Sequence, residues 1–551
     1  MPPQTRARLY TATGYAVAVA ALALGVPPFL QSPPWCDLTL YQLAARNFLA
    51  GGVLYRDLFD TNLPGFVWAL AAAQAVFGES VVAVRAIDLA VVGAVTATLA
   101  RHVTDSGGTP ATRAWFVAGV ALFYPFTSEF CHAQRDVWML LPAVLAFRLR
   151  VAGRAPFVEG LVWGCAVWVK PHVVVPAFAV WAVSLRVRPP GRAAGTLPLL
   201  AGGSLLGLLG VAALVATGAW PGFVEVCTVW NPEYTAGTLA ELPKRVPTTL
   251  QYFAPWSLMH AVTVPMAVIH LAQARRANPV ARPRALFAAL YLGWLLQALV
   301  IQRGLEYVHV PETLLALAVL GAHRVPVGLT AGLTLAVQAT LFEIGLGDVT
   351  RRTDYFPLEV PRVLDPAVRE AWPDCFGPGG PALRDRLRQY DTHCVPTWTD
   401  LAAVEGYLRT VEPPLRDGEL LAFHDSPHPL YLSLNLRPAT RYLHFGTVFG
   451  MRSQQPRVAA EVRAASPRYV VSDLKRMTWV HGIDAAPDAR GDPQGLPAWL
   501  PLSQRDRFPW DQPIAFRAGR YVVHRVAGPL GDIDIPDWRV LGDLGPGEPP
   551  R

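Results

Sequence analysis

A series of long apolar runs, which continues to about Leu346, constrains the fold of this 551-residue chain more than any other feature. Hydrophobic residues make up 52% of the chain and charged residues only 16%, a balance that a soluble domain of this length does not reach. About 20 consecutive apolar residues are enough for one helix to cross a bilayer. The sequence therefore predicts a polytopic α-helical membrane protein whose surroundings are a lipid bilayer.

Eleven of these runs are candidates for membrane-crossing helices. They are Tyr10–Leu30, Val82–Ala100, Ala114–Thr127, Val137–Phe147, Phe157–Val169, Val173–Leu185, Leu197–Thr217, Phe253–Ala272, Ala285–Ile301, Leu305–Ala322 and Val325–Leu346. Several are shorter than the ~20 residues that a crossing needs, so we expect their helices to extend into flanking polar residues. No Ala-x-Ala-like cleavage site follows the first run, which we therefore interpret as a span and not as a signal peptide.

Arginines indicate the orientation, because they cluster in every second turn between the runs. The clusters comprise Arg101 and Arg113, then Arg148, Arg150 and Arg154, then Arg186, Arg188 and Arg192, then Arg275, Arg276, Arg282 and Arg284, and finally Arg324. The positive-inside rule then predicts a multi-pass protein of the cytoplasmic (inner) membrane with a cytoplasmic N-terminus. Counting Gly65–Phe77 as a further span would move these clusters outside, so we expect that segment to be a helix lying in the interface. The net charge of +7 reflects this topology, and we expect no nucleic-acid partner.

Polarity changes after the last apolar run, which divides the chain into two parts. Residues 1–346 form the predicted transmembrane domain with an outer loop at 31–81, and residues 347–551 form a soluble, extracytoplasmic α/β domain. Strand-like segments in the second part are Glu419–His424, Pro467–Asp473 and Gly519–Arg525, and helical spacing occurs in Asp400–Thr410 and Gln455–Ala465. Tyr431, Tyr442 and His444 could line a surface for an acceptor, although aromatic residues in such a fold are more often core or rim.

Cysteines on the predicted outer side admit several pairings. Cys375 and Cys394 could form a disulfide across a short loop. Cys36, Cys131 and Cys227 also lie near the outer face, and their pairing cannot be deduced from the sequence.

The outer loop contains the acids that most suggest chemistry. Between Trp35 and Phe66 it holds Asp37, Asp57 and Asp60 directly after the first apolar run. A carboxylate at the mouth of a membrane cavity is energetically expensive, so each acid is a candidate functional residue. The alternative is that they are ordinary solvated loop acids.

Three further turns bring unusual polar residues to the same predicted face. The segment EFCHAQRDVW contains Arg135 and Asp136, WVKPHVVV contains Lys170, and IQRGLEYVHVPE contains Arg303, Tyr307 and His309. A lysine within an apolar stretch needs an anion, a snorkelling path or a wet cavity. Interfacial anchoring is the structural alternative, and it is weakened because all these loops lie on one face.

The order of these motifs resembles that of the type-C fold (GT-C) membrane glycosyltransferases. The motifs are an Asp after the first span, Tyr-Arg-Asp-x-x-Asp-x-x-x-Pro-Gly from Tyr55, Arg135-Asp136, an intramembrane Lys170-Pro, and Tyr-x-His-x-Pro from Tyr307. The similarity covers residues 1–346 and is greatest to the protein O-mannosyltransferase and lipid A aminoarabinose transferase group. It implies a sugar donor linked to a polyprenyl phosphate, an acceptor glycan, lipid or protein, and Asp37 as the catalytic base.

The implied chemistry assigns a role to most candidates. Asp37 would accept a proton from the acceptor hydroxyl as it attacks the anomeric carbon, with inversion. Lys170 and Arg303 would stabilise charge on the departing phosphate, and His309 would donate a hydrogen bond. Asp57, Arg135 and Tyr307 complete the predicted substrate-binding set, although Asp57, beside Arg56, fits a loop ion pair better.

Metal dependence stays open at this stage. Asp60 and Asp136 would orient the sugar or a basic partner, or would bind a divalent cation through oxygen ligands. Family members often carry two adjacent acids where this chain has Cys36-Asp37-Leu38, and no His/Asp/Glu cluster has a recognisable ligand spacing. A divalent cation is therefore an alternative, and no cofactor is certain.

Two other classes of function fit the same topology. A transporter also places charges in a membrane cavity, but it usually contains two similar halves, and no internal repeat is evident in the sequence. A non-enzymatic relative would present its outer domain to a partner. The presence of Asp37 and Lys170 argues against that alternative.

Overall fold

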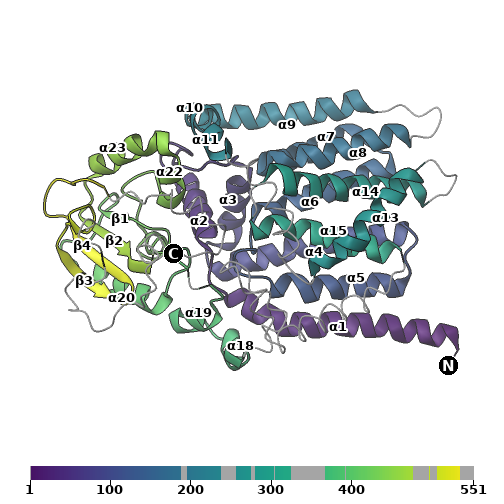
Figure 1. Cartoon of the computed structure of the whole chain (residues 1–551), viewed down its shortest axis with the longest axis horizontal. Helices are drawn as coiled ribbons and strands as arrows, with labels where there is room; N and C mark the ends of the chain where they lie inside the picture. The colour runs from purple at the N-terminus through teal and green to yellow at the C-terminus, as the bar shows by residue number, and fades with distance from the viewer. Residues whose placement is uncertain are drawn as a thin grey trace.

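The protein consists of a bundle of long helices joined at one end to a smaller mixed domain (Figure 1). This computed structural model describes residues 2–187, 195–236, 256–274, 280–302, 305–323, 366–390, 392–475, 496, 500 and 505–533. The N-terminus lies at the end of the bundle far from the mixed domain. The N-terminus and the mixed domain therefore lie at opposite ends of the bundle.

Helices occupy ten of the eleven predicted spans, and the last, Val325–Leu346, lies outside the described residues. The helices are α1 (Pro3–Gln31), α4 (Val81–Asp105), α5 (Pro110–Phe123), α6 (Arg135–Ala152), α7 (Pro156–Val169), α8 (Val174–Arg186), α9 (Thr196–Ala216), α13 (His260–Ala272), α14 (Ala281–Leu296) and α15 (Val310–Ala322). Among the described residues, four are long and apolar enough to cross a membrane: α1, α4, α9, and α14 with its extension to Ile301. The number of crossings stays a prediction.

The expected lengthening of the short runs is correct for one helix and wrong for others. Helix α6 begins at Arg135 and has 18 residues, so it includes polar residues before its apolar run. Helices α7 and α8 have only 14 and 13 residues, because the chain breaks its helical hydrogen bonding at Lys170-Pro171 between them. Proline lacks the backbone N–H that would continue the helix. This break leaves the Lys170 side chain at a helix end.

Glycines allow α7 and α9 to pack in close contact. A Cβ atom added at Gly160 would lie 2.0 Å from the carbonyl oxygen of Leu199, and one added at Gly202 would lie 2.0 Å from that of Phe157. Small residues at helix crossings let the backbones approach and gain van der Waals contact, which drives helix association in lipid. The two helices therefore pack closely at Gly160 and Gly202, where a larger side chain would clash with the facing backbone.

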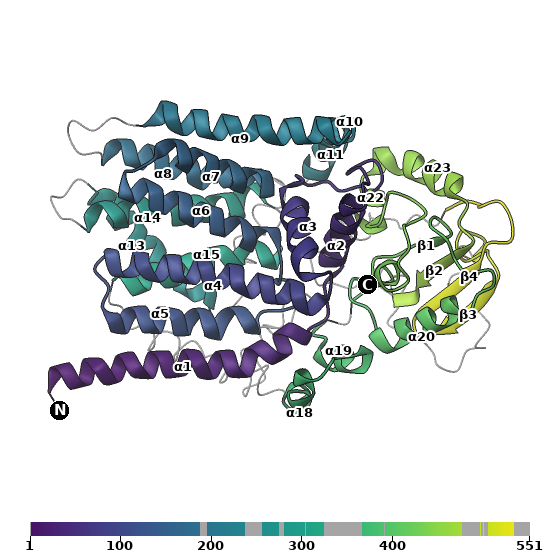
Figure 2. The ribbon, with the colours of Figure 1, turned by 180° about the vertical axis from the view of Figure 1, so that it is seen from behind.

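Two helices of the outer loop lie across the end of the bundle. Helix α2 (Cys36–Leu49) and helix α3 (Gly65–Phe77) lie between the bundle and the mixed domain (Figure 2). A Cβ atom at Gly65 would lie 2.4 Å from the backbone of Trp168, so α3 begins directly against the end of α7. Helix α3 is therefore a helix as predicted, and its place in the membrane interface stays a prediction.

The mixed domain contains a four-stranded sheet of order β1-β2-β4-β3. Its strands are β1 (Leu420–Ala422), β2 (Tyr469–Asp473), β3 (Ile514–Ala518) and β4 (Tyr521–Arg525); β1 and β2 are parallel and the other pairs antiparallel. Its helices are α18 (Pro366–Ala371), α19 (Pro381–Leu387), α20 (Trp398–Arg409), α21 (Pro429–Ser433), α22 (Phe445–Gly450) and α23 (Gln455–Ala465). The predicted strands and helices correspond to β1, β2, β4, α20 and α23. The predicted α/β character is therefore correct, and β3 was missed.

The short helices α10 (Trp220–Glu225) and α11 (Asn231–Ala236) follow α9 and contact the mixed domain. The Glu225 carboxylate lies 3.4 Å from the Arg441 guanidinium, and the Ser453 amide donates to Glu233 at 3.1 Å. These contacts fix the mixed domain over the outer loop.

Candidate active site at the junction of the two domains

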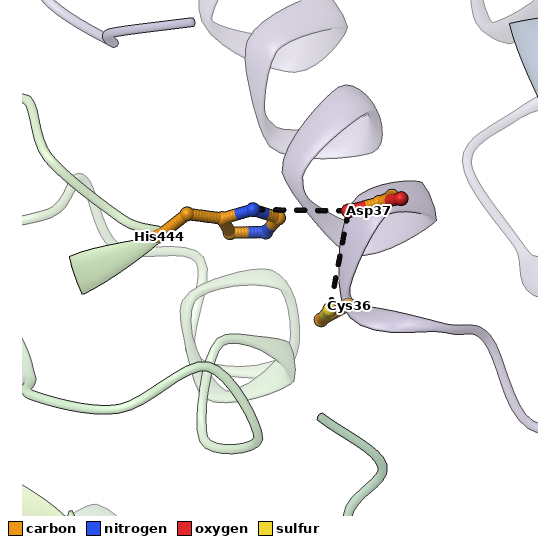
Figure 3. A group of neighbouring side chains, drawn as sticks. All are labelled: Cys36, Asp37 and His444. Atoms are coloured by element: carbon orange, nitrogen blue, oxygen red, sulfur yellow. Dashed lines mark hydrogen bonds and ion pairs between the residues drawn. The ribbon is translucent and has the colours of Figure 1, made fainter. Parts of the chain in front are cut away.

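Asp37 lies in the first turn of α2, where the bundle, the outer loop and the mixed domain meet. His444 Nδ1 is 3.7 Å from Asp37 Oδ1 (Figure 3). Gln134 Nε2 donates to Asp37 Oδ2 at 3.5 Å. The side chain is 22% exposed. Its polar contacts are long, so its oxygens can still accept a proton.

Arg135, at the start of α6, is a buried cation that has Asp60 and Asp136 as electrostatic neighbours. Its guanidinium lies over the ring of Tyr41 at 5.5 Å. Its Nε atom is buried and has no hydrogen-bond partner, and the guanidinium forms no ion pair with any described residue. A buried charge without a protein partner is unfavourable unless a ligand or water compensates it. Arg135 is therefore the strongest anion-binding candidate in the described part of the chain.

Asp60 is an electrostatic neighbour of Arg135. The pKa of the Asp60 carboxyl is raised above its ordinary value because the side chain is buried. The positive charge of Arg135 opposes this effect but does not cancel it. Asn62 donates to Asp60 Oδ1 through its side chain at 2.6 Å and through its backbone at 3.2 Å. The amide of Asn62 also lies 3.5 Å from the hydroxyl of Tyr41. Sequence reasoning missed Tyr41 and Asn62, for which no motif provides a signal.

Lys170 is paired. Its Nζ donates to both oxygens of Asp136, at 2.9 and 2.7 Å, and to the side-chain oxygen of Gln302. Gln302 in turn donates to Asp136 at 3.1 Å. Of the three possibilities considered for Lys170, an anion, a snorkelling path or a wet cavity, the structure provides the anion, which is Asp136. Lys170 also lies 5.6 Å from the ring of Tyr307, which brings that predicted residue into the same group.

Two predicted site residues, His309 and Asp57, make their hydrogen bonds and ion pairs with residues other than Asp37. His309 Nδ1 is 2.5 Å from Glu312 Oε1, and both side chains are buried. Asp57 pairs with Arg56 at 2.6 Å and accepts from the Val53 amide at 2.7 Å. The ion pair with Arg56 is the role that the sequence favoured for Asp57. Arg303 lies outside the described residues.

Glu129 and Glu306 anchor the mixed domain to the bundle. Glu306 Oε2 accepts from the Tyr390 hydroxyl at 2.9 Å and from the Ser128 hydroxyl at 3.1 Å. Glu129 Oε1 accepts from the backbone amides of Gln389 and Tyr390 at 3.0 and 3.1 Å. These contacts support the alternative that some polar residues of the outer turns are structural anchors.

Only one of the three aromatic residues proposed for an acceptor surface contacts the candidate base. His444 faces Asp37 and stacks on His428 at 5.6 Å. Tyr431 is buried and accepts from the Ala422 amide at 2.7 Å, and Tyr442 is buried against Glu461 at 3.0 Å. The two tyrosines are core residues. Within the described residues neither Cys375 nor Cys394 is in a disulfide, so the pairing considered for them is not formed.

Comparison with solved structures identifies the fold. No protein-family model matches the sequence, and no curated protein matches it. The structure is similar to ArnT from Cupriavidus metallidurans bound to undecaprenyl phosphate, with a TM-score of 0.53 and 13% identity over 96% of this chain and 100% of ArnT. The archaeal oligosaccharyltransferase AglB from Archaeoglobus fulgidus gives a TM-score of 0.43 and 12% identity over 85% and 70% of the two chains. The similarity to ArnT confirms the fold predicted from the motifs: the chain has a GT-C-like fold.

Proposed function

We propose that the protein transfers a sugar from a polyprenyl-phosphate donor to an acceptor glycan, lipid or protein at the outer face of the cytoplasmic membrane. The observation that carries this proposal is that a candidate base, Asp37, and a buried cation, Arg135, lie at the same end of the bundle. Asp37 is a carboxylate with weak contacts, and Arg135 is a buried cation that forms no ion pair with any residue that the structure describes. Glycosyl transfer needs a base for the acceptor and a cation for the departing phosphate.

Asp37 is the base in this proposal. It removes the acceptor proton as the acceptor oxygen attacks the anomeric carbon, the glycosidic bond to phosphate breaks, and the phosphate departs with the bonding electrons. The configuration inverts because no covalent intermediate forms. His444, 3.7 Å from Asp37, orients the carboxylate from the side of the mixed domain.

Arg135 stabilises the departing phosphate. A guanidinium in a dry site interacts strongly with developing negative charge, because no water screens it. The ArnT structure of the same fold holds undecaprenyl phosphate, which supports a lipid phosphate as this group. Lys170, fixed by Asp136 and Gln302, supplies a second, partly compensated cation. Tyr307 packs against Lys170 and limits the position of its ammonium group.

Asp60 and the remaining predicted residues act around this centre. Asp60, held by Asn62, orients the sugar or Arg135. His309 supports the site through Glu312 and α15, and Arg303 is proposed as a further phosphate contact. Asp57 fixes the outer loop through its ion pair with Arg56.

Two experiments test the proposal. The first measures which lipid-linked sugar accumulates when the gene is deleted, and then measures its transfer by purified protein in lipid discs. Accumulation of a polyprenyl-phosphate sugar and transfer in vitro are expected. If no lipid-linked sugar accumulates and none is consumed, the proposed reaction is wrong.

The second experiment tests the orientation. Reporter fusions at Gly108, between α4 and α5, and at Gly418, before β1, should read cytoplasmic and extracytoplasmic respectively, following the arginine distribution. A cytoplasmic signal at Gly418 would refute this topology.

A further inference from the structure

Six side chains of metal-ligating type, one of which is the proposed base Asp37, lie in two neighbouring groups. They come from four segments of the chain. The ligand atoms of Cys36, Asp37 and His444 lie within 4.8 Å of one another, and so do those of His393, Cys394 and Asp425. Figure 3 shows the first group, in which the edge of the His444 ring that carries both nitrogens faces α2.

The two groups are joined through their sulfur atoms. The thiol of Cys36 interacts with the thiol of Cys394 and with the carboxylate of Asp425, both of which belong to the second group. Neither cysteine is in a disulfide. Two thiols, two imidazoles and two carboxylates thus converge on one place between α2 and the mixed domain.

His444 has a ring nitrogen that suits a ligand role. Its Nδ1 lies 3.7 Å from Asp37, and its Nε2 is buried without a hydrogen-bond partner among the described residues. Histidines that bind metals commonly use one nitrogen for the metal and place the other against a carboxylate. Asp37 fills that second position for His444. A carboxylate oxygen of Asp425 lies within 4.8 Å of a ring nitrogen of His393.

The donor atoms select the kind of ion. Mg²⁺ and Ca²⁺ prefer oxygen ligands, whereas Zn²⁺ is held by thiolates and imidazoles, usually four in a tetrahedron. We propose that Cys36, His393, Cys394 and His444 form a zinc site that ties α2 to the mixed domain. Asp37 and Asp425 are outer partners of the two histidines in this arrangement, so Asp37 stays available as a base.

Such a site has a mechanical consequence. Cys36 and Asp37 are adjacent in the first turn of α2, and Cys394 and His393 lie just before α20. A zinc ion shared between them fixes the position of the Asp37 backbone relative to the mixed domain. Binding energy of this kind contributes directly to folding and docking.

Metal content of the full-length protein tests the proposal without reference to activity. The protein is purified in detergent with a tag that lacks histidine and is analysed by inductively coupled plasma mass spectrometry. We expect about one zinc ion per chain, and a fall of about tenfold or more in Cys36→Ser and in Cys394→Ser. Cys227→Ser, a change of an exposed cysteine, is the matched control and should keep its zinc.

Two further measurements keep the result interpretable. Replacement of zinc by Co²⁺ should give a sulfur-to-metal charge-transfer band in the wild type and in Cys227→Ser, and no such band in the two ligand variants. Asp37→Asn should retain zinc while losing transfer, which separates this proposal from the proposed function. Zinc at trace level in the wild type, equal zinc in all cysteine variants, or a Cys36–Cys394 disulfide in freshly extracted protein would each overturn the zinc site.

Discussion

Arg135 is held differently from the buried and half-buried arginines at the opposite end of the helix bundle. At the end near the N-terminus, Arg150 pairs with Glu159 at 2.8 Å. Arg282 donates to the carbonyls of Val151 and Arg150 at 3.0 and 3.2 Å, and Arg284 donates to those of Ser106 and Ala322 at 2.8 and 3.1 Å. At the other end, Arg135 has no ion pair with the described residues.

We interpret this difference as one between arginines that support the fold and an arginine that is proposed to bind a ligand. The arginines near the N-terminus satisfy the last carbonyls of α4, α6 and α15, where cations are favoured by the helix dipole. They serve the fold in addition to setting topology. Arg135 forms no ion pair with the described residues, and within the protein the nearby charges of Asp60 and Asp136 offset part of the cost of its burial. Lys170 is intermediate, since Asp136 compensates its charge within the bundle.

The largest effect is expected at Asp37. Asp37→Asn preserves the shape of the side chain but cannot accept the acceptor proton, so the single-turnover transfer rate should fall by ~10²–10⁴-fold while the donor still binds. The measurement uses purified protein in lipid discs. Asp57→Asn is the matched control in the same loop and should transfer at close to the wild-type rate. Transfer by Asp37→Asn at close to the wild-type rate would show that Asp37 is not the base.

An effect on stability alone is expected at the other end of the bundle. Arg150→Gln leaves the buried Glu159 carboxylate without its partner and should lower the free energy of unfolding by about 3–5 kcal/mol. The double variant Arg150→Gln/Glu159→Gln should recover part of that loss, and transfer per folded molecule should be unchanged in both. Loss of transfer in a fully folded Arg150→Gln protein would contradict the division between the two ends.

The smallest effect is expected at Asp57. Arg56 lowers the pKa of the Asp57 carboxyl, so the ion pair stabilises the protein above the unfolded-state pKa and that stabilisation is lost as the pH falls through the folded-state pKa. Because the pair is largely exposed, Asp57→Asn should lower the free energy of unfolding by less than ~1 kcal/mol at neutral pH. Below both the folded-state and the unfolded-state pKa of Asp57, the substitution should leave the free energy of unfolding unchanged. Thermal unfolding at the two pH values measures the difference. A larger loss, or one independent of pH, would assign Asp57 another role.

The sequence predicted the regular parts of the fold because their physical signals are local. Apolar runs coincide with helices, and β1, β2 and β4 are rich in buried β-branched or aliphatic residues. Strand β3 was missed because each of its residues is only half-buried, which leaves no apolar alternation to detect. The break at Lys170-Pro171 shortened α7 and α8 below the expected lengths.

The site was harder to predict because its contacts join distant segments. The ion pair of Lys170 with Asp136 spans 34 positions, and the contact of Asp37 with His444 joins the outer loop to the mixed domain. Rules based on the spacing of residues in the sequence do not predict contacts between segments that are so far apart in the chain. The pair of His309 with Glu312 was available from a three-residue spacing on one helix face, and the sequence interpretation overlooked it.

Binding of undecaprenyl phosphate to arginine variants tests the difference between the two ends most directly. Dissociation constants are measured in detergent for the wild type, Arg135→Gln and Arg282→Gln, which carry the same substitution at opposite ends of the bundle. Loss of one charge-assisted hydrogen bond in Arg135→Gln should weaken binding by about tenfold or more, while Arg282→Gln should bind like the wild type when folded. Equal binding by Arg135→Gln and the wild type would contradict the assignment of Arg135 as the phosphate-binding cation.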